Sequence, residues 1–486
     1  MLLKDVVAEL DVCHLEGSLD FDIQGIAYDS RKVQPGFLFV AIKGFVTDGH
    51  DYINQAIQNG ASAVIVERPM TAAVPTIQVA DSRIALALTA AKFYHYPSNK
   101  LTITGVTGTN GKTTTTYLIA AIYKAAGSKV GLVGTIQNLV GGKETPATNT
   151  TPESLDLQQL FDNMVNAGVT HATMEVSSHA LALNRTYGVE FDAAVFTNIT
   201  QDHLDFHQNM EDYAAAKAKL FTMAPLAIIN ADDGRAQDVI AASKGTVVTY
   251  GIRRAADVGV KDVQLTAQGV SFITTGKYGE HKLNLKLTGE FNVYNALAAF
   301  TLGVAQGYDV EVVIKALAGV TGVAGRFELV DRGQPFAVVV DYAHTPDGLE
   351  NVLKAAKAIT TNRLIAVFGC GGDRDRTKRP IMGEIGTKYS DLAVITSDNP
   401  RTEEPDQIIA EVLEGVQRAV DLDHSYKVLA DRREAINYAI KEAKPGDVVV
   451  IAGKGHETYQ IIGKTKYDFD DRLVAAQALE SLGYKG

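Results

Sequence analysis

The chain has 486 residues, a net charge of −11 and 46% hydrophobic residues. This length exceeds that of a usual single domain, so we expect two to four domains, each with a buried core. The acidic balance argues against a general nucleic-acid-binding protein, which needs a basic face, although a local basic pocket can still attract an anionic substrate. No apolar run reaches the roughly 18 residues of a membrane span, and the first residues lack the apolar core of a signal peptide.

Cys13 and Cys370 are the two cysteines of the chain. They lie far apart in the sequence and lack metal-ligand spacing, so they predict neither a disulfide framework nor a metal site. Isolated thiols are typical of a reducing compartment. We therefore expect a cytoplasmic protein.

The first hundred residues have the pattern of a small α/β unit. Buried strands are expected at 36–42 and 63–66, with a helix over 52–57 between them. The stretch 96–99, Tyr-Pro-Ser-Asn, is rich in turn-forming residues and predicts a domain boundary.

A second unit begins with the strand 101–106, followed by a glycine-rich loop and a helix over 113–126 that Gly127 ends. The further apolar runs that alternate with helical patterns are 193–196 and 226–229. This alternation is typical of a doubly wound, largely parallel sheet. The stretch 257–290 alternates polar and apolar residues with glycines, which predicts antiparallel hairpins.

A third unit begins near residue 331 and again alternates apolar runs with helical segments. Its expected strands are 337–340, 364–368, 392–395 and 448–451. This pattern predicts another largely parallel sheet with helices on both faces. The chain is therefore expected to be an α/β protein with three domains, at 1–98, 99–330 and 331–486.

The glycine-rich loop Gly108–Thr114 is the clearest functional motif. The strict phosphate-loop pattern needs a glycine where Val106 stands, so the full pattern fails. Gly111-Lys112-Thr113 nevertheless follows a strand and opens a helix, and this context disfavours an ordinary glycine turn. Glycines let backbone N–H groups approach phosphate, and a helix N-terminus favours negative charge. Lys112 is expected to reach the β and γ phosphates of ATP, and Thr113 to hold Mg²⁺.

Two other segments contain groups that suit a nucleotide site. Glu175 follows an expected strand and is a candidate Mg²⁺ ligand, and a dense polar segment spans 197–207. Each segment alone also fits a capping turn. His203 is unexpected as a ligand of Mg²⁺, which prefers oxygen. Lys217 and Lys219 lie on a helical stretch, where composition alone favours a solvated face.

A series of short motifs runs in one order along the chain. They stand at 28–31, 108–114, 149–152, 175–179, 197–198, 202–205, 289–296, 325–328, 341–346, 398–401 and 453–457. In these motifs the chain resembles the Mur ligase family over essentially its whole length. The resemblance implies an N-terminal domain that grips a UDP-linked substrate, a central ATP-binding domain, and a Rossmann-like third domain that brings the incoming amino acid.

The resemblance also implies a reaction in cytoplasmic peptidoglycan precursor synthesis, by a monomer that uses ATP and Mg²⁺. ATP phosphorylates the D-glutamate carboxylate of UDP-N-acetylmuramoyl-L-alanyl-D-glutamate, and an amine then attacks the acyl phosphate. The positions that resemble ATP contacts are Gly108, Thr109, Asn110, Gly111, Lys112, Thr113, Thr114, Asn295, Arg326 and Asp341. The positions that resemble contacts to the UDP-linked substrate are Ser30, on the uracil side, and Asn149, Thr150, Thr151, Ser177 and Arg185.

Four residues match catalytic positions of the family, namely Lys112, Lys217, Glu175 and His203. Lys217 matches a lysine that becomes carbamylated, which reverses the solvated-face interpretation, because a carbamate is an anionic oxygen ligand. The expected metal positions are Thr113, Glu175, His203 and the Lys217 carbamate. Leu183 stands where the family often has a glutamine, so one substrate hydrogen bond is in doubt.

The incoming amino acid is expected to be meso-diaminopimelate. It differs from L-lysine by one carboxylate, which a forked arginine can recognise. Arg401 stands in the Asp-Asn-Pro-Arg motif of the diaminopimelate-adding relatives, and lysine-adding relatives commonly lack that arginine. The full set that resembles the amino-acid site is Arg374, Asp398, Asn399, Pro400, Arg401, Gly453 and Glu457.

Three alternatives remain open. A lysine-adding Mur ligase is the nearest, and Arg401 disfavours it. A folylpolyglutamate synthase-like ligase is more remote, because that family is not expected to have the Asp398–Arg401 motif or the N-terminal UDP-binding unit. A non-catalytic ATP-binding relative predicts loss of Lys112, Glu175 or Lys217, and all three are present.

Overall fold

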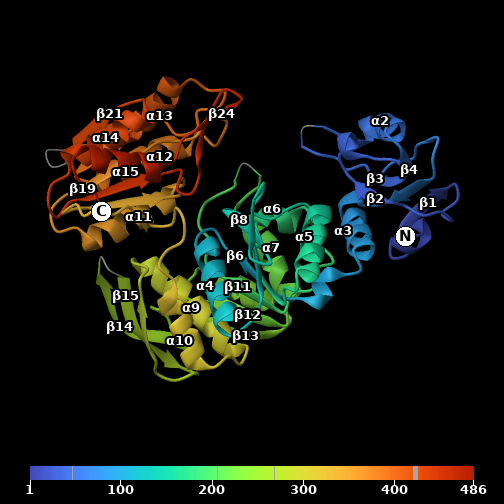
Figure 1. Ribbon diagram of the computed structural model, residues 1–486, viewed down its shortest axis with the longest axis horizontal. Coiled ribbons are helices and arrows are strands. Elements are labelled where there is room, and N and C mark those ends of the chain that lie inside the picture. Colours follow the sequence, from blue (N-terminus) through green and yellow to red (C-terminus); the bar gives the residue numbers. More distant parts are fainter. Residues whose placement is uncertain (46, 205, 267–268, 420–424, 486) are drawn as a thin grey trace.

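Three separate sheets organise the chain. The computed structural model describes residues 1–45, 47–204, 206–266, 269–419 and 425–485. We call the parts around these sheets the N-terminal unit (α1 to α3), the central unit (η3 to α10) and the C-terminal unit (β17 to α15). In Figure 1 the N-terminal and C-terminal units stand on opposite sides above the central unit.

The N-terminal unit is a five-stranded sheet with the order β1-β5-β4-β3-β2. Its elements are α1 (Leu3–Val6), β1 (Val12–Glu16), β2 (Gly25–Ala27), η1 (Ser30–Lys32), β3 (Phe37–Val40), η2 (Gly49–Tyr52), α2 (Ile53–Gln58), β4 (Ala61–Val66), β5 (Thr76–Val79) and α3 (Ser82–Phe93). The central strands are buried, and α3 starts at an N-cap, Asp81, whose carboxylate accepts from the amides of Arg83 and Ile84.

The central unit is an eleven-stranded sheet with the order β16-β15-β14-β13-β12-β11-β6-β10-β7-β8-β9. Its strands are β6 (Thr102–Thr107), β7 (Val130–Val133), β8 (Gln137–Val140), β9 (Lys143–Pro146), β10 (His171–Glu175), β11 (Ala193–Phe196), β12 (Leu226–Asn230), β13 (Thr246–Tyr250), β14 (Val258–Thr266), β15 (Gly269–Gly276) and β16 (Lys282–Leu285). The strands from β13 to β7 are parallel, and antiparallel hairpins extend both edges.

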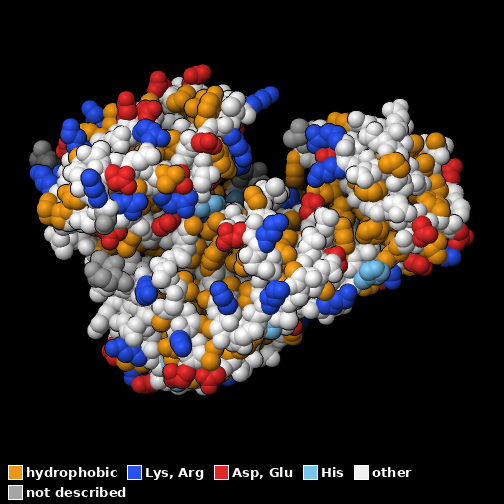
Figure 2. Space-filling model, viewed as in Figure 1, with side chains coloured by type: hydrophobic (Ala, Val, Ile, Leu, Met, Phe, Trp, Pro, Cys, Tyr) orange, Lys and Arg blue, Asp and Glu red, His pale blue; other side chains and the backbone are white. Residues whose placement is uncertain are grey.

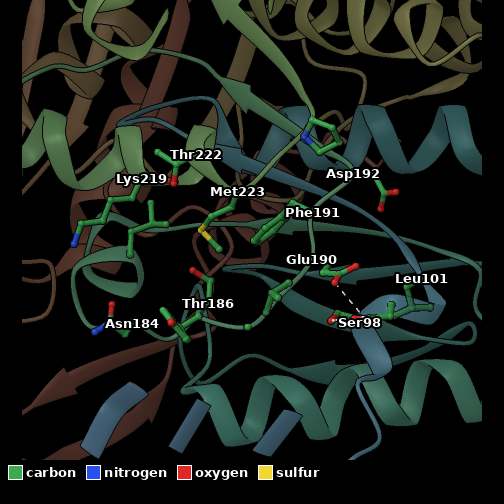
Figure 3. A pocket seen from close by; sticks show the side chains of 16 residues that line it. Ser98, Leu101, Asn184, Thr186, Glu190, Phe191, Asp192, Lys219, Thr222 and Met223 are labelled. Carbon is green, nitrogen blue, oxygen red and sulfur yellow. Dashed lines mark hydrogen bonds between the residues drawn. The ribbon is translucent and has the colours of Figure 1, made fainter. Parts of the chain in front are cut away.

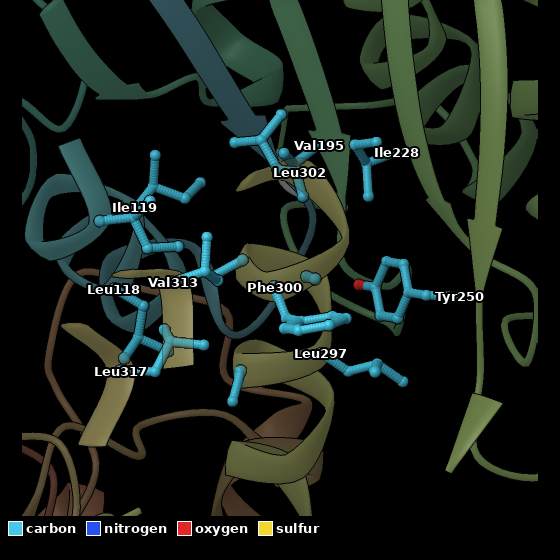
Figure 4. Close-up of a cluster of buried hydrophobic side chains, with 14 of the residues drawn as sticks. Leu118, Ile119, Val195, Ile228, Tyr250, Leu297, Phe300, Leu302, Val313 and Leu317 are labelled. Atoms are coloured by element: carbon cyan, nitrogen blue, oxygen red, sulfur yellow. The ribbon is translucent and has the colours of Figure 1, made fainter. Parts of the chain in front are cut away.

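Helices cover both faces of this sheet. They are η3 (Pro97–Lys100), α4 (Lys112–Ala125), α5 (Ser154–Asn166), α6 (Ser178–Ala182), α7 (Met210–Ala218), η4 (Lys219–Thr222), α8 (Ala236–Ala242), α9 (Glu290–Ala305) and α10 (Val310–Gly319). Figure 4 shows α4, α9 and α10 packed together through Ile119, Phe300 and Leu317. Full burial of such a side chain contributes about 1.5–3 kcal/mol. This cluster therefore holds the first helix after the glycine-rich loop firmly in place.

The C-terminal unit is a six-stranded sheet with the order β17-β18-β22-β19-β20-β21, and only β17 is antiparallel to its neighbour. Its strands are β17 (Glu328–Leu329), β18 (Ala337–Asp341), β19 (Leu364–Phe368), β20 (Leu392–Ile395), β21 (Ser425–Val428) and β22 (Val448–Ala452), with the separate hairpin β23 (Tyr459–Ile462) and β24 (Thr465–Asp468). Its helices are α11 (Pro346–Ile359), α12 (Lys378–Lys388), α13 (Pro405–Ala419), α14 (Arg432–Glu442) and α15 (Asp471–Ser481).

The expected α/β class with three units is confirmed, and the expected strands recur within a few residues. The predicted hairpins of 257–290 are β14 to β16, although α9 begins at Glu290, and residues 267–268 lie outside the described chain, as does Asp205 of the 202–205 motif. The domain boundaries stay predictions; β17 joins the C-terminal sheet although it lies before residue 331. Of the helices in the described ranges, none combines the length and apolarity that a bilayer crossing needs.

Candidate active site

Three neighbouring parallel strands end together at one edge of the central sheet. β6 lies between β10 and β11, so that Glu175 pairs with Val106 and Phe196 pairs with Thr107. The segments that follow these strands therefore emerge side by side, as ligand-binding segments do in open α/β sheets. The glycine-rich loop Gly108–Thr114 is the middle one of the three.

The loop approaches its neighbours so closely that it needs glycine at two positions. Gly108 and Gly111 have φ angles of 151° and 84°, which disfavour other residues. A Cβ atom at Gly108 would lie 1.9 Å from Oγ1 of Thr197, and one at Gly111 would lie 2.4 Å from Oδ1 of Asn295. Lys112 opens α4, and its Nζ donates to the carbonyls of Gly108 (2.9 Å) and Thr109 (2.7 Å).

A second lysine reaches the same carbonyl. Nζ of Lys217, on α7, donates to the Gly108 carbonyl at 2.8 Å, and the residue is only 1% exposed. Burial lowers its pKa well below the ordinary value of a lysine, and the nearby charge of Lys112 lowers the pKa further. The solvated-face interpretation from composition is thus wrong for Lys217, because the helix turns that residue into the sheet edge. Lys219, two residues on, is exposed.

Of the expected metal positions, Thr113 and Glu175 are in contact. The Thr113 hydroxyl donates to Oε2 of Glu175 at 3.0 Å and accepts from Nη2 of Arg326 at 3.0 Å. The other oxygen of Glu175 accepts from the backbone amide of Thr135. Within the residues that the structure describes, no group of three or more His, Cys, Asp or Glu side chains could hold a metal. A hard cation here would depend on hydroxyl, carboxylate and substrate oxygens together.

His203 lies beside this edge, with its backbone in the left-handed region at φ 55°. Its Nε2 is 3.4 Å from a carboxylate oxygen of Asp202, and its ring is 4.8 Å from the ring of His179. Its side chain is 41% exposed and lines the cavity described next.

A cavity of about 790 Å³ opens above the strand ends, between the central and C-terminal units. Figure 2 shows a wider hollow above the central unit, between the N-terminal and C-terminal units. The residues that line the cavity itself all come from the central and C-terminal units. The predicted site residues that line the cavity are Asn149, Thr150, Thr151, Ser177, Arg185, His203, Arg374, Asp398, Asn399, Arg401, Gly453 and Glu457. The cavity thus joins the substrate set of the central unit to the amino-acid set of the C-terminal unit.

The substrate set is held by hydrogen bonds at the end of β10. The Thr151 hydroxyl donates to the Glu175 carbonyl (2.9 Å) and accepts from the Ser177 amide (3.0 Å), while Arg185 donates to the Thr151 carbonyl (3.2 Å). Thr150 shares a hydrogen bond with Thr135. These contacts place polar side chains directly beside the glycine-rich loop.

Ser30 is the exception, because it belongs to the N-terminal unit and does not line this cavity. Its hydroxyl donates to Oε1 of Gln55 at 3.0 Å. The N-terminal unit contacts the central unit through Glu153, whose carboxylate lies 3.1 Å from Arg83 and 3.3 Å from Arg185. One carboxylate therefore connects the unit that contains Ser30 to the cavity.

The amino-acid set lies at the carboxyl ends of β19, β20 and β22. Nη1 of Arg401 donates to the Gly372 carbonyl at 2.7 Å, and its other guanidinium nitrogens have no hydrogen-bond partner among the described residues. Asn399 donates to Oε2 of Glu457 at 2.9 Å. Arg374 is exposed beside them on the neighbouring loop. Pro400 does not line the cavity, and its carbonyl packs against Gly372.

The remaining ATP positions surround the loop from the other side. The Asn295 amide donates to Asn292, and its oxygen faces Gly111. Burial raises the pKa of Asp341, whose carboxylate accepts from the amides of Phe327 (2.7 Å) and Ala343 (2.8 Å). Asp341 thereby fixes the turn that presents Arg326 to Thr113.

Several residues of the site were not expected from the sequence. Lys454 is fully buried, and its Nζ donates to Oδ1 of Asn399 at 2.9 Å and lies 3.5 Å from Glu457. Asp347 of α11 accepts from Nδ2 of Asn110 at 2.6 Å and so connects the C-terminal unit to the phosphate loop. Lys454 stands inside the 453–457 motif and could have been found there; Asp347 lies just beyond the 341–346 motif, and no sequence signal pointed to it.

A second cavity, of about 730 Å³, lies at the opposite, amino-terminal edge of the central sheet. Figure 3 shows Lys219 and Met223 on one side of it and Glu190 with Asp192 on the other. The sequence did not predict it. Since it opens away from the phosphate loop, it is separate from the site described above.

Comparisons with known proteins agree with this layout. The profiles described as Mur ligase family, catalytic domain; Mur ligase middle domain; and Mur ligase, glutamate ligase domain match residues 22–94, 106–303 and 325–455. The UDP-N-acetylmuramoyl-L-alanyl-D-glutamate–2,6-diaminopimelate ligase of Caldanaerobacter subterraneus is 50% identical over 481 residues, 98% of each chain. The ligase of the same name from Clostridioides difficile is 48% identical and covers 99% of this chain and 100% of its own.

A solved structure of a ligase of that name superposes with a TM-score of 0.72 at 33% identity and covers 100% of both chains. A folylpolyglutamate synthase of Mycobacterium tuberculosis has a TM-score of 0.63 at 19% identity, covering 83% of this chain and 96% of its own, which shows a shared fold alone. Because relatives near 50% identity match along almost their whole length, the chain belongs to the Mur ligase family.

Proposed function

We propose that this chain is the ATP-dependent ligase that adds meso-2,6-diaminopimelate to UDP-N-acetylmuramoyl-L-alanyl-D-glutamate, in peptidoglycan precursor synthesis. One observation supports this most: the phosphate-loop edge with Thr151 and Ser177 shares a cavity with Arg374 and Arg401. The carboxylate that is activated and the amine that attacks it can therefore bind on opposite walls of the same cavity.

The chemistry requires activation before the bond forms. A carboxylate is a poor electrophile because its leaving group would be oxide, so ATP first phosphorylates the D-glutamate carboxylate to an acyl phosphate with release of ADP. The amine nitrogen then forms a bond to the carbonyl carbon, and the tetrahedral intermediate collapses as the C–O bond to phosphate breaks. The Lys112 ammonium and the loop amides offset the negative charge that gathers on the transferred phosphoryl group.

Magnesium fits the residues present. Thr113 and Glu175 offer hard oxygen ligands in contact with each other, and the Lys217 carbamate would add two more oxygens near the Gly108 carbonyl. Mg²⁺ bound there would neutralise phosphate charge. His203 stands on the cavity side of this set and is proposed to approach it only with substrate bound.

Carbamylation of Lys217 follows from its surroundings. Its buried amine lies beside Lys112, and both groups share the Gly108 carbonyl, so the charged ammonium form is disfavoured. The lone pair of a neutral amine can attack the carbon of CO₂: an N–C bond forms, one C=O π bond of CO₂ breaks to give an anionic oxygen, and water takes up the proton that the nitrogen loses. The carbamate would stand close to the Lys112 ammonium and could act as an oxygen ligand of Mg²⁺ when the metal is bound.

Replacing Lys217 with alanine is expected to remove a mass increment of one CO₂ that the intact protein shows in bicarbonate. It should also lower kcat by about 10²- to 10³-fold, because charge-stabilising groups at a transferring phosphoryl group typically contribute this much. Lys219→Ala is the matched control, since Lys219 lies two residues further along the chain and is exposed. Native mass spectrometry and ADP release measure the two effects; an increment that persists in Lys217→Ala would place the carbamate elsewhere.

The proposed function is tested by mixing the protein with ATP, Mg²⁺, the UDP-dipeptide and one amine at a time, and measuring phosphate release. We expect release with meso-diaminopimelate, little with L-lysine, and none with a folate acceptor in place of the UDP-dipeptide. Release with L-lysine alone would favour the lysine-adding alternative. A protein that binds ATP and releases no phosphate with any amine would be the non-catalytic relative.

A single copy of the chain is proposed to be sufficient, because all three sets of predicted binding residues come from one chain. In analytical ultracentrifugation at the protein concentration of the assay, we expect the mass of a single chain. We also propose a cytoplasmic location, where ATP and UDP-linked substrates are available.

A further inference from the structure

The two loops that contain Arg374 and Arg401 are joined by an unusually dense set of contacts. Within this pair of loops, the Gly372 amide donates to the Asn399 carbonyl (2.9 Å), and the Arg401 guanidinium donates to the Gly372 carbonyl (2.7 Å). A Cβ atom at Gly372 would lie 1.9 Å from the Pro400 carbonyl oxygen. The loops therefore touch through their backbones, and their separation sets the distance between the two arginines.

This arrangement is strained at two places. Asp373 has a φ of 53° and Arg401 has a φ of 51°, both in the left-handed region that side chains disfavour. Such residues persist only where the surroundings hold them there. Thr402 contributes to keeping Asp373 in this conformation, because its hydroxyl donates to Oδ1 of Asp373 at 2.7 Å. The backbone of Arg401 also pairs with Ile461 and Gly463 of the β23–β24 hairpin.

Arg379, on α12, joins the two loops to each other, and its own side chain is fully buried. Its guanidinium forms a forked pair with Glu403, at 2.8 and 2.9 Å, and donates to Glu411 of α13 at 2.8 Å. It also reaches the Gly371 carbonyl at 3.3 Å, and Glu403 accepts from the Asp373 amide at 2.6 Å. One cation thus contacts the first loop directly and holds the second through Glu403. In Figure 1, α12 and α13 lie next to each other in the C-terminal unit.

We propose that Arg379 is a positioning residue for amino-acid selection: with Glu403 it clamps the two loops so that Arg374 and Arg401 face two carboxylates of one ligand. The proposal rests on the proposed function, since only a ligand with a carboxylate at each end uses both arginines. Arg379 itself is buried behind the loops and does not line the cavity. The hydrogen bond from Arg379 also holds the pKa of Glu403 down to about 2, so this ion pair stays charged below the pH at which an ordinary glutamate takes up a proton.

The test compares Arg379→Lys and Glu403→Gln with the unchanged protein. Lysine keeps the charge but lacks the fork. We expect each variant to raise KM for meso-diaminopimelate by about 10- to 100-fold, because displacements near 1 Å in a supporting shell have effects of this size. KM for ATP and for the UDP-dipeptide should stay within twofold, and the preference for meso-diaminopimelate over L-lysine should narrow.

Arg363→Lys is the matched control. Arg363 pairs with the buried Asp447 at 2.8 Å, but it stands just before β19, at the opposite end of the sheet from the loops. The Arg363→Lys variant should have a lower melting temperature and an unchanged preference for meso-diaminopimelate over L-lysine. If Arg379→Lys and Glu403→Gln lower turnover with both amines equally and leave the preference intact, the clamp is only structural and the proposal is wrong. If the unchanged protein does not use meso-diaminopimelate at all, the proposed function is wrong. The same assay of the unchanged protein therefore distinguishes this failure from a failure of the proposal on Arg379.

Discussion

Replacing Lys112 with alanine is expected to lower kcat by on the order of 10³-fold, because one cationic donor at a transferring phosphoryl group contributes about this much. In the structure its ammonium is folded onto the carbonyls of Gly108 and Thr109. These acceptors are neutral, so a negatively charged nucleotide phosphate can replace them, because charge-assisted hydrogen bonds are stronger. The loss should appear in the first step, so ADP release should fall even before any amine is added.

Two measurements separate this effect from a loss of folding. Lys124→Ala removes another lysine of the same helix, which is exposed in its last turn, and should leave kcat unchanged. The melting temperature of Lys112→Ala should equal or exceed that of the unchanged protein, because burial disfavours the charge of Lys112 and lowers its pKa. Normal ADP release by Lys112→Ala would contradict the assignment of this loop to phosphate.

Replacing Arg401 with alanine should have the second large effect, and a selective one. Removing one partner of a desolvated charge pair costs about 2–5 kcal/mol, which corresponds to a loss of about 30- to 5,000-fold in kcat/KM for meso-diaminopimelate. KM for ATP should stay the same, because Arg401 stands on the wall of the cavity that belongs to the C-terminal unit. Steady-state kinetics with each substrate varied in turn measures both kcat/KM for meso-diaminopimelate and KM for ATP.

Arg418→Ala is a suitable comparison, because Arg418 is an exposed arginine of the same unit, in the last turn of α13. It should not alter kcat/KM for either amine. Unchanged diaminopimelate kinetics in Arg401→Ala would refute the specificity argument while leaving the ATP chemistry untouched.

Local pattern predicted the long buried strands of each sheet, but it left others unpredicted, such as the buried β7. The runs at 193–196 and 364–368 are continuous and apolar, as strands buried on both faces must be, and they recur as β11 and β19. β9 and β24 were missed because their residues are polar and mostly exposed, so they lack the signal of burial. Edge hairpins of this kind are held by backbone hydrogen bonds, which the residue types in the sequence do not indicate.

The site was predicted unevenly for a related reason. Lys217 has the same local sequence as an exposed helical lysine, and only the turn of α7 toward the sheet edge buries it. Glu175 was found because strand ends can be read from the chain. The contacts of Asp347 with Asn110 and of Arg379 with Glu403 join segments that the sequence cannot place side by side. Tertiary packing decides these cases.

The two walls of one cavity are proposed to join an activated UDP-dipeptide to meso-diaminopimelate. In a competition assay the protein receives ATP, Mg²⁺, the UDP-dipeptide and equal amounts of meso-diaminopimelate and L-lysine, and mass spectrometry identifies the products. We expect nearly all product to contain diaminopimelate, with one ADP released per product. A product that contains mainly lysine, or ADP release without any joined product, would show that the cavity does not join these two substrates.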